Sequence, residues 1–317
     1  MPARANVMGR PKRIGAFWRK VVDNRVLLLM ISPALIFFTL FSYVPMPGII
    51  MAFQRFTYDG GIFGSPWVGF DNFRFFFVSG DALRVTMNTL TFNASFLIVN
   101  TVLQCGVAIM LSEISRKYFK KCTQTFMFLP YFISWVVVGA FIYNIFNYEF
   151  GALNTFLVSI RREPVDMYGN PEAWRYILII SRAWKDLGYG VVLYLAAIMS
   201  IDQEMYEAAD IDGANVFQKI TRITIPCLVP TIIILTLLAV SYIFRGDFQM
   251  FFNIVGNNGM LFNATDVIDT YVFRSLIRVQ EFGLSAAVGA YQSVLNLTII
   301  LTTNGIIRKL HPEYALF

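Results

Sequence analysis

Long apolar segments constrain this chain more than any other feature. Six stretches carry few charges and reach the length of about 20 residues that a helix needs to cross the hydrocarbon core of a bilayer. Of the 317 residues, 56% are hydrophobic and only 15% are charged, whereas a soluble domain carries about 25% charged residues. The segments lie at 26–50, 86–111, 123–147, 174–199, 225–245 and 284–307.

Lipid offers the backbone no hydrogen-bond partners, so we expect each segment to form a continuous helix. The predicted fold class is an all-α integral membrane protein with six transmembrane helices. The first segment follows basic residues, as in a signal peptide, but it is long and no small-x-small site follows it, which favours a retained helix. The predicted organisation is a basic tail at 1–25, a first transmembrane helix at 26–50, an outside loop at 51–85, a helical core at 86–307 that includes the loop 201–226, and a tail at 308–317.

Lysine and arginine predict the orientation. With the N-terminus inside, the inner regions hold fifteen of these residues, whereas the outer loops, although longer, hold eight. Both termini and the loop 201–226 are therefore predicted to be cytoplasmic. In the first outer loop, residues 69–77 interleave aromatic and polar side chains, as an interfacial helix would, although a loop packed on the bundle fits equally well.

The net charge of +6 does not indicate nucleic-acid binding, because the basic residues sit in short clusters beside apolar segments. A membrane enzyme would need paired carboxylates, a metal cluster or an activated nucleophile, yet His311 is the only histidine. A stand-alone secondary transporter would need mid-membrane acids and repeated halves, and Asp186 is the one clear mid-span acid. No G-x-x-x-x-G-K-[ST] phosphate loop is present, so this chain is predicted to bind no cofactor and to leave ATP hydrolysis to a partner.

The loop 201–226 predicts a short helix followed by a second one. Asp202 can cap a helix from Gln203 to about Ile211, and Gly213 can end it because a positive φ costs glycine little. A second helix is expected from about Ala214, with Pro226 starting the next span. Composition leaves two interpretations open, a knob that docks in a groove of another protein and a hairpin that caps the bundle.

The sequence of this loop, with Glu207-Ala208-Ala209, Gly213 and Ile223-x-Ile225-Pro226, resembles the E-A-A-x-x-x-G-x9-I-x-L-P motif of binding-protein-dependent ABC importer permeases. Only the leucine differs, replaced by Ile225. The resemblance implies a type I ABC importer-like fold with a cytoplasmic coupling helix that docks on an ATPase, whose closure drives alternating access. The residues implied in coupling are Glu207, Ala208, Ala209, Asp212, Gly213, Ala214 and Pro226.

Further segments are similar to the LplB-like branch for polysaccharides and aldouronates within the carbohydrate-uptake group, and to the permease of an alginate-oligosaccharide importer. These segments are Tyr43-Val-Pro-Met46, 63–69, Asn88-Thr89, 129–137 and 266–271. The resemblance implies a location in the bacterial inner membrane and an oligosaccharide substrate. It also implies a second, usually different, permease chain, two ATP-binding subunits that carry ATP and Mg, and an extracytoplasmic solute-binding protein.

Polar groups inside spans are costly and are candidates for function. Span four carries Arg182, Lys185 and Asp186, followed by Gly188-Tyr-Gly190. One interpretation is a Lys185–Asp186 charge balance that only fixes packing. The other is a polar stripe along a water-filled path, with Trp184 and Tyr189 stacking on sugar faces.

Arg245 ends span five, where the branch that this chain resembles often has an acidic or small polar residue. We expect Arg245, together with Arg182, to attract uronate carboxylates, because a guanidinium fork matches a carboxylate. Import of neutral oligosaccharides or of another solute is the alternative. On span six, Gln292 and Asn296 fit interhelical hydrogen bonds as well as substrate contacts.

Overall fold

The computed structural model of the protein describes residues 23–310, and this range contains helices joined by loops without a β-strand. The all-α prediction is therefore confirmed for the described range. Two compact units are present, one ending at Ile50 and the other beginning at Met51. The predicted basic tail and C-terminal tail lie largely outside the described residues.

The first unit is mostly one apolar helix. It contains α2 (Arg25–Phe38) and the π-helical turn η1 (Thr39–Tyr43), and the 3-10 segment η2 (Met46–Phe53) begins within it. Pro45 lies between the two irregular segments and cannot donate a backbone hydrogen bond. None of the α2 side chains is buried, which suits a helix surrounded by lipid.

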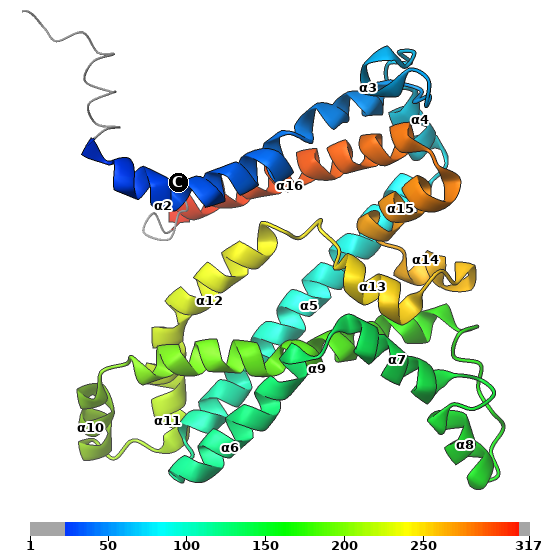
Figure 1. Cartoon of the computed structure of the whole chain (residues 1–317). Helices are drawn as coiled ribbons and strands as arrows, with labels where there is room; N and C mark the ends of the chain where they lie inside the picture. The colour runs from blue at the N-terminus through cyan, green and yellow to red at the C-terminus, as the bar shows by residue number, and fades with distance from the viewer. Residues whose placement is uncertain (1–22, 311–317) are drawn as a thin grey trace, which may run out of the picture. The chain divides into compact units, whose positions relative to one another are not determined.

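The second unit is built on two long helices, α5 (Asp81–Ser112) and α9 (Pro171–Met199), which pack along one another (Figure 1). The other elements are α3 (Gly61–Gly64), α4 (Asp71–Val78), α6 (Lys117–Phe128), η3 (Leu129–Phe132), α7 (Trp135–Phe146), α8 (Ala152–Ser159), α10 (Gln203–Ile211), α11 (Val216–Lys219), η4 (Ile220–Thr224), α12 (Ile225–Val240), α13 (Phe248–Val255), η5 (Gly259–Leu261), α14 (Phe262–Thr265), α15 (Ile268–Arg274), η6 (Ser275–Val279) and α16 (Phe282–Leu310).

Two apolar clusters hold α5 and α9 together. One joins them to α7 and α13 around Phe92, Trp174 and Phe251, and the other joins them to α12 around Tyr194 and Leu228. The backbone of α9 also approaches α6 closely. A Cβ atom built on Gly188 would lie 2.0 Å from the Met127 carbonyl oxygen, so only glycine permits this approach.

Within residues 23–310, four helical segments are long and apolar enough to span a membrane by themselves, or up to six if each of two bent pairs is one span. The predicted span 123–147 is one of these pairs, because α6 with η3 and α7 meet at an angle of 92°. The expectation of a continuous helix is therefore wrong for this segment. The break follows Pro130, whose ring is not tolerated in a helix interior without a kink.

The segment after span five folds into short helices, from α13 to η6. The aromatic stretch of the first outer loop forms α4, which packs on α16. Phe76 is fully buried against Tyr271 and Tyr291, while Phe75 and Phe77 are exposed. The stretch is therefore a helix that packs on the bundle, and its location at a membrane interface stays a prediction.

Replacing Gly188 with alanine should destabilise the protein by about 1–3 kcal/mol, because the methyl group forces α9 away from the α6 backbone. The thermal unfolding midpoint in detergent measures this loss. Gly106→Ala is the matched control, since no atom lies within 4 Å of its added Cβ and alanine favours a helix. Equal midpoints for the two variants would contradict the close-approach role of Gly188.

Candidate functional site

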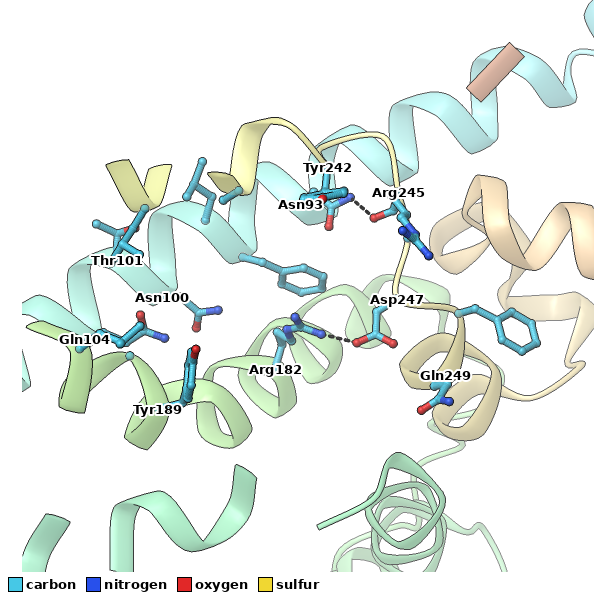
Figure 2. Close-up of a pocket in the computed structure, with 18 of the residues that line it drawn as sticks. Asn93, Asn100, Thr101, Gln104, Arg182, Tyr189, Tyr242, Arg245, Asp247 and Gln249 are labelled. Atoms are coloured by element: carbon cyan, nitrogen blue, oxygen red, sulfur yellow. Dashed lines mark hydrogen bonds and ion pairs between the residues drawn. The ribbon is translucent and has the colours of Figure 1, made fainter. Parts of the chain in front are cut away.

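A cavity of about 630 Å³ lies against α5 and α9 and reaches the segment between α12 and α13 (Figure 2). Its wall on α5 carries amide and hydroxyl groups at helical spacing, and its wall on α9 carries Arg182 and Tyr189. The carboxylates of Asp247 and Asp269 also belong to the lining, and apolar and aromatic side chains complete it. The polar side chains on α5 are Asn93, Asn100, Thr101 and Gln104.

Two of these amides also hold the wall in place. Asn93 donates to the carbonyl oxygens of Ile243 and Arg245 at 2.7 and 3.1 Å, which attaches the chain after α12 to α5. Gln104 donates to the Asp186 carbonyl oxygen at 3.1 Å and so joins α5 to α9. This stripe was not among the predicted site residues, although the sequence carries a signal for it, four polar residues at positions i, i+7, i+8 and i+11 of one apolar span.

Arg182 is the centre of an ion cluster at the cavity wall. Its Nε atom lies 2.5 Å from Asp186 Oδ2, one turn further along α9, and its terminal nitrogen pairs with Asp247 across the cavity wall. Asp247 also accepts from Trp135 Nε1 at 3.2 Å and caps α13 by accepting from Met250 N at 3.1 Å. Two carboxylates therefore compensate the charge of Arg182.

Lys185 binds backbone carbonyl groups and forms no ion pair with Asp186. It is only 8% exposed, and its Nζ atom donates to the carbonyl oxygens of Pro130, Tyr131 and Ile133 at 3.3, 2.8 and 2.6 Å. The rings of Tyr131 and Trp135 lie 5.6 and 5.3 Å from it. The ammonium group thus provides a donor for the Tyr131 and Ile133 carbonyls at the bend between α6 and α7, and a second donor for the Pro130 carbonyl, which also accepts from Ile133 N at 3.1 Å.

The aromatic candidates on α9 differ in position. Tyr189 lines the cavity, and one face of its ring is stacked on Tyr131 at a centroid distance of 4.8 Å and an angle of 11°. Only the remaining face and the edge are available to a ligand. Trp184 is 45% exposed and belongs to the lining of none of the cavities described here.

Arg245 lines the cavity with an exposed side chain, and within residues 23–310 it forms no ion pair. The next residue, Gly246, donates its N–H to Asp269 Oδ2 at 2.6 Å, and Gln292 donates to the same oxygen at 2.9 Å. Burial raises the pKa of the Asp269 carboxyl, while these two hydrogen bonds lower it. Gln292 therefore supports the segment that carries Arg245.

Asn296 lies further along α16, outside the lining of these cavities. Its side-chain oxygen is buried and accepts no hydrogen bond from the described part of the chain. The structure thus gathers Arg182, Tyr189 and Arg245 at one cavity, with Lys185 and Asp186 behind its wall. It leaves Trp184 and Asn296 apart from them.

The loop between α9 and α12 folds as its sequence predicts at the first helix. Asp202 caps α10 by accepting from Glu204 N at 3.0 Å, and Gly213 follows the helix with φ of 74°. The second helix starts slightly later than expected, at Val216, because Asn215 and Gln218 form a capping box. The π-helical turn η4 then leads without interruption into α12, so Pro226 lies in a continuing helix.

This segment presents a small-residue surface to its surroundings. Glu207, Ala208, Asp212 and Gly213 are exposed, whereas Ala209 and Ala214 are half-buried beside a hollow of about 290 Å³. Large apolar side chains flank it, with Ile211 87% and Phe217 72% exposed. We name α10, Gly213 and α11 the coupling hairpin. Two contacts brace it, Tyr206 Oη to Thr224 Oγ1 at 2.9 Å and Lys219 Nζ to Asp210 Oδ1 at 2.8 Å.

Long apolar helices around a polar cavity, together with an exposed helical hairpin, define a membrane transport component. Residues 101–312 match the family of binding-protein-dependent transport system inner membrane components. The chain belongs to this family and is the permease subunit of an ABC importer.

Two proteins of Bacillus subtilis (strain 168) are similar over nearly the whole chain. Protein LplB is 32% identical and covers 94% of both chains, and the polygalacturonan/rhamnogalacturonan transport system permease protein YteP is 31% identical and covers 93% of this chain and 91% of its own. A crystal structure of a bacterial ABC transporter involved in the import of the acidic polysaccharide alginate has a chain with a TM-score of 0.84, 34% identity and coverage of 93% of this chain and 99% of that chain.

A second crystal structure shows a bacterial alginate ABC transporter in complex with an alginate pentasaccharide-bound periplasmic protein. Its matching chain has a TM-score of 0.82, 33% identity and coverage of 92% of this chain and 97% of that chain. These comparisons confirm the resemblance that the sequence motifs indicate.

Lys185→Met should lower the thermal unfolding midpoint and the yield of assembled protein, because the carbonyl groups of Tyr131 and Ile133 at the bend lose their donor. Each unsatisfied buried group costs about 1–3 kcal/mol. Lys121→Met, which removes an exposed ammonium group, is the control and should leave the midpoint nearly unchanged. A Lys185→Met protein as stable as the control would show that the bend needs no buried cation.

Proposed function

We propose that this chain translocates an acidic, uronate-type oligosaccharide, such as an alginate oligosaccharide, through the cavity between α5 and α9. The observation that carries the proposal is Arg245, an exposed guanidinium without an ion pair among the described residues. The other charged side chains of this lining already have partners, since Arg182 pairs with Asp247 and Asp269 accepts hydrogen bonds from Gly246 N and Gln292. The similarity to a transporter that imports an acidic polysaccharide supports the same substrate class.

The lining matches the chemistry of such a sugar. A guanidinium binds a carboxylate through two parallel hydrogen bonds. The amides of Asn100 and Gln104 can both donate to and accept from hydroxyl groups. The free face of Tyr189 offers an apolar surface for the C–H face of a pyranose ring.

A neutral oligosaccharide is the second candidate substrate, because Arg182 is already paired with two carboxylates and the stripe on α5 is uncharged. The two candidate substrates differ in the hydrogen bond that they can form with Arg245. A neutral sugar gains no charge-assisted hydrogen bond from it, whereas a uronate does.

We further propose that the coupling hairpin docks on an ATP-binding subunit and transmits its closure to the spans. Its small residues and the exposed Ile211 and Phe217 suit insertion into a groove of a partner protein. The complete importer would contain a second permease, different from this one, two ATPases that bind ATP and Mg, and an extracytoplasmic binding protein. It would lie in the bacterial inner membrane, with both termini of this chain in the cytoplasm.

Arg245→Gln should lower uptake of acidic oligosaccharides at least about tenfold, because a charge-assisted pair contributes about 1.5–3 kcal/mol, and should leave neutral uptake nearly unchanged. Uptake of defined acidic and neutral oligosaccharides of equal length into membranes containing the whole importer measures both. Arg74→Gln, which removes an exposed charge in α4 outside the cavity, is the control. An equal loss for both sugars would reduce Arg245 to a structural residue.

Glu207→Lys and Gly213→Asp should each abolish uptake while the protein still inserts into the membrane. The first reverses a charge on the docking surface, and the second places a side chain at a φ of 74° on that surface. Co-purification of the ATPase and cross-linking from a cysteine at position 209 report the docking directly. Glu149→Lys, an exposed charge reversal after α7, is the control. Normal uptake by both hairpin variants would contradict the docking role.

A further inference from the structure

The Arg182–Asp247 ion pair stands at the boundary of two cavities. One is the cavity of about 630 Å³ against α5 and α9, and the other, of about 400 Å³, lies beside the bend between α6 and α7. Arg182, Asp247 and Gln249 line both cavities. Figure 2 shows the two charged side chains reaching toward one another from α9 and from the segment before α13.

The two carboxylates that pair with Arg182 are held differently. Asp186 lies four residues further along α9 and therefore moves with Arg182. Asp247 comes from the segment between α12 and α13, so its pair with Arg182 crosses between separate elements. Each side chain of this crossing pair is 28% exposed, so a solute in either cavity can reach it.

Asp247 keeps other hydrogen bonds if Arg182 is taken away. Trp135 Nε1 and the backbone N–H of Met250 both donate to its carboxylate. A carboxylate left with two donors costs far less than one left unpaired in a low-dielectric site. A substrate carboxylate can therefore replace Asp247 at Arg182, because Arg182 then keeps an anionic partner and Asp247 keeps two hydrogen-bond donors.

Arg245 lies two residues before Asp247 and belongs to the wall of the larger cavity. The intervening Gly246 is tied to Asp269 by its N–H, which restrains the segment that carries both side chains. An entering carboxylate would meet the unpaired Arg245 on the same wall as the paired Arg182.

We propose that Asp247 is an internal carboxylate that occupies Arg182 until a carboxylate of the substrate replaces it, so that this pair determines specificity for anionic sugars at the boundary of the two cavities. The proposal rests on the proposed function, import of an acidic oligosaccharide. A uronate replaces one anion with another and keeps Arg182 paired, whereas a neutral sugar offers no replacement charge. A neutral sugar therefore leaves the pair closed and gains nothing from Arg182, whereas a uronate gains a charge-assisted pair with it.

The test uses the whole importer in proteoliposomes and compares KM and kcat for an acidic and a neutral oligosaccharide of equal length. Asp247→Asn removes the competing charge and keeps the Oδ1 atom that accepts from Met250 N, because asparagine caps a helix as well as aspartate does. Its amide nitrogen replaces the Oδ2 atom that accepts from Trp135 Nε1, so this one hydrogen bond is lost. We expect KM for the acidic sugar to fall at least about fivefold, the lower end of typical coupling between competing ligands. KM for the neutral sugar should stay unchanged.

Two further variants keep the outcome interpretable. Asp247→Glu retains the competing charge, so its KM for the acidic sugar should not fall below that of the wild type. The double variant Arg182→Gln/Asp247→Asn removes both charges of the crossing pair, so it should lose the gain that Asp247→Asn alone produces. Asp81→Asn, which removes a partner of Arg84 away from both cavities, is the matched control and should change neither KM.

An Asp247→Asn importer whose KM rises for the acidic sugar, or changes equally for both sugars, would overturn the exchange. If Asp247→Asn fails to assemble, Asp247→Glu decides the question. A KM for the acidic sugar below that of the wild type would overturn the proposed exchange. A KM for the acidic sugar that is unchanged or raised, with an unchanged KM for the neutral sugar, would support it. A wild-type importer without preference for acidic sugars would instead refute the proposed function. The two failures are therefore distinguishable.

Discussion

The contact between the Lys185 ammonium group and three backbone carbonyls supports much of the second unit. A sharp bend in a membrane protein exposes carbonyl groups that lipid cannot satisfy, and here a buried cation on α9 satisfies them. The bend then directs α7 toward α13 and places Trp135 beside Asp247. The ion cluster and the boundary between the two cavities both depend on this arrangement.

Electrical compensation divides the charged side chains of the site into two kinds. Arg182 and Lys185 together balance the two negative charges of Asp186 and Asp247, with Arg182 paired to both carboxylates and Lys185 held by carbonyl oxygens. Arg245 is the cation on the cavity wall that pairs with no acid of the described range. Arg182, Asp247 and Asp269 of the same lining already have partners, so Arg245 offers a simple basis for selecting a substrate with a negative charge.

Prediction succeeded where local chemistry decides the structure. The helix 203–211, its cap at Asp202 and the positive φ of Gly213 follow from side-chain and backbone preferences within a few residues. Prediction failed where distant segments decide it. The bend after Pro130 and the pairing of Lys185 with carbonyls depend on contacts between α6, α7 and α9, and the stripe from Asn93 to Gln104 gains meaning only once α9 lies opposite it.

The sequence by itself determined the membrane character, the family and the two short helices around Gly213, because hydrophobic length and short-range helix signals are properties of contiguous residues. The sidedness of the chain is likewise a prediction from its charges. Only the tertiary structure decided which polar residues share a cavity, which charges are already paired and which helix is broken. Ion pairs and hydrogen bonds form between atoms a few ångströms apart, and the chain order of Arg182, Arg245 and Asp247 does not reveal that proximity.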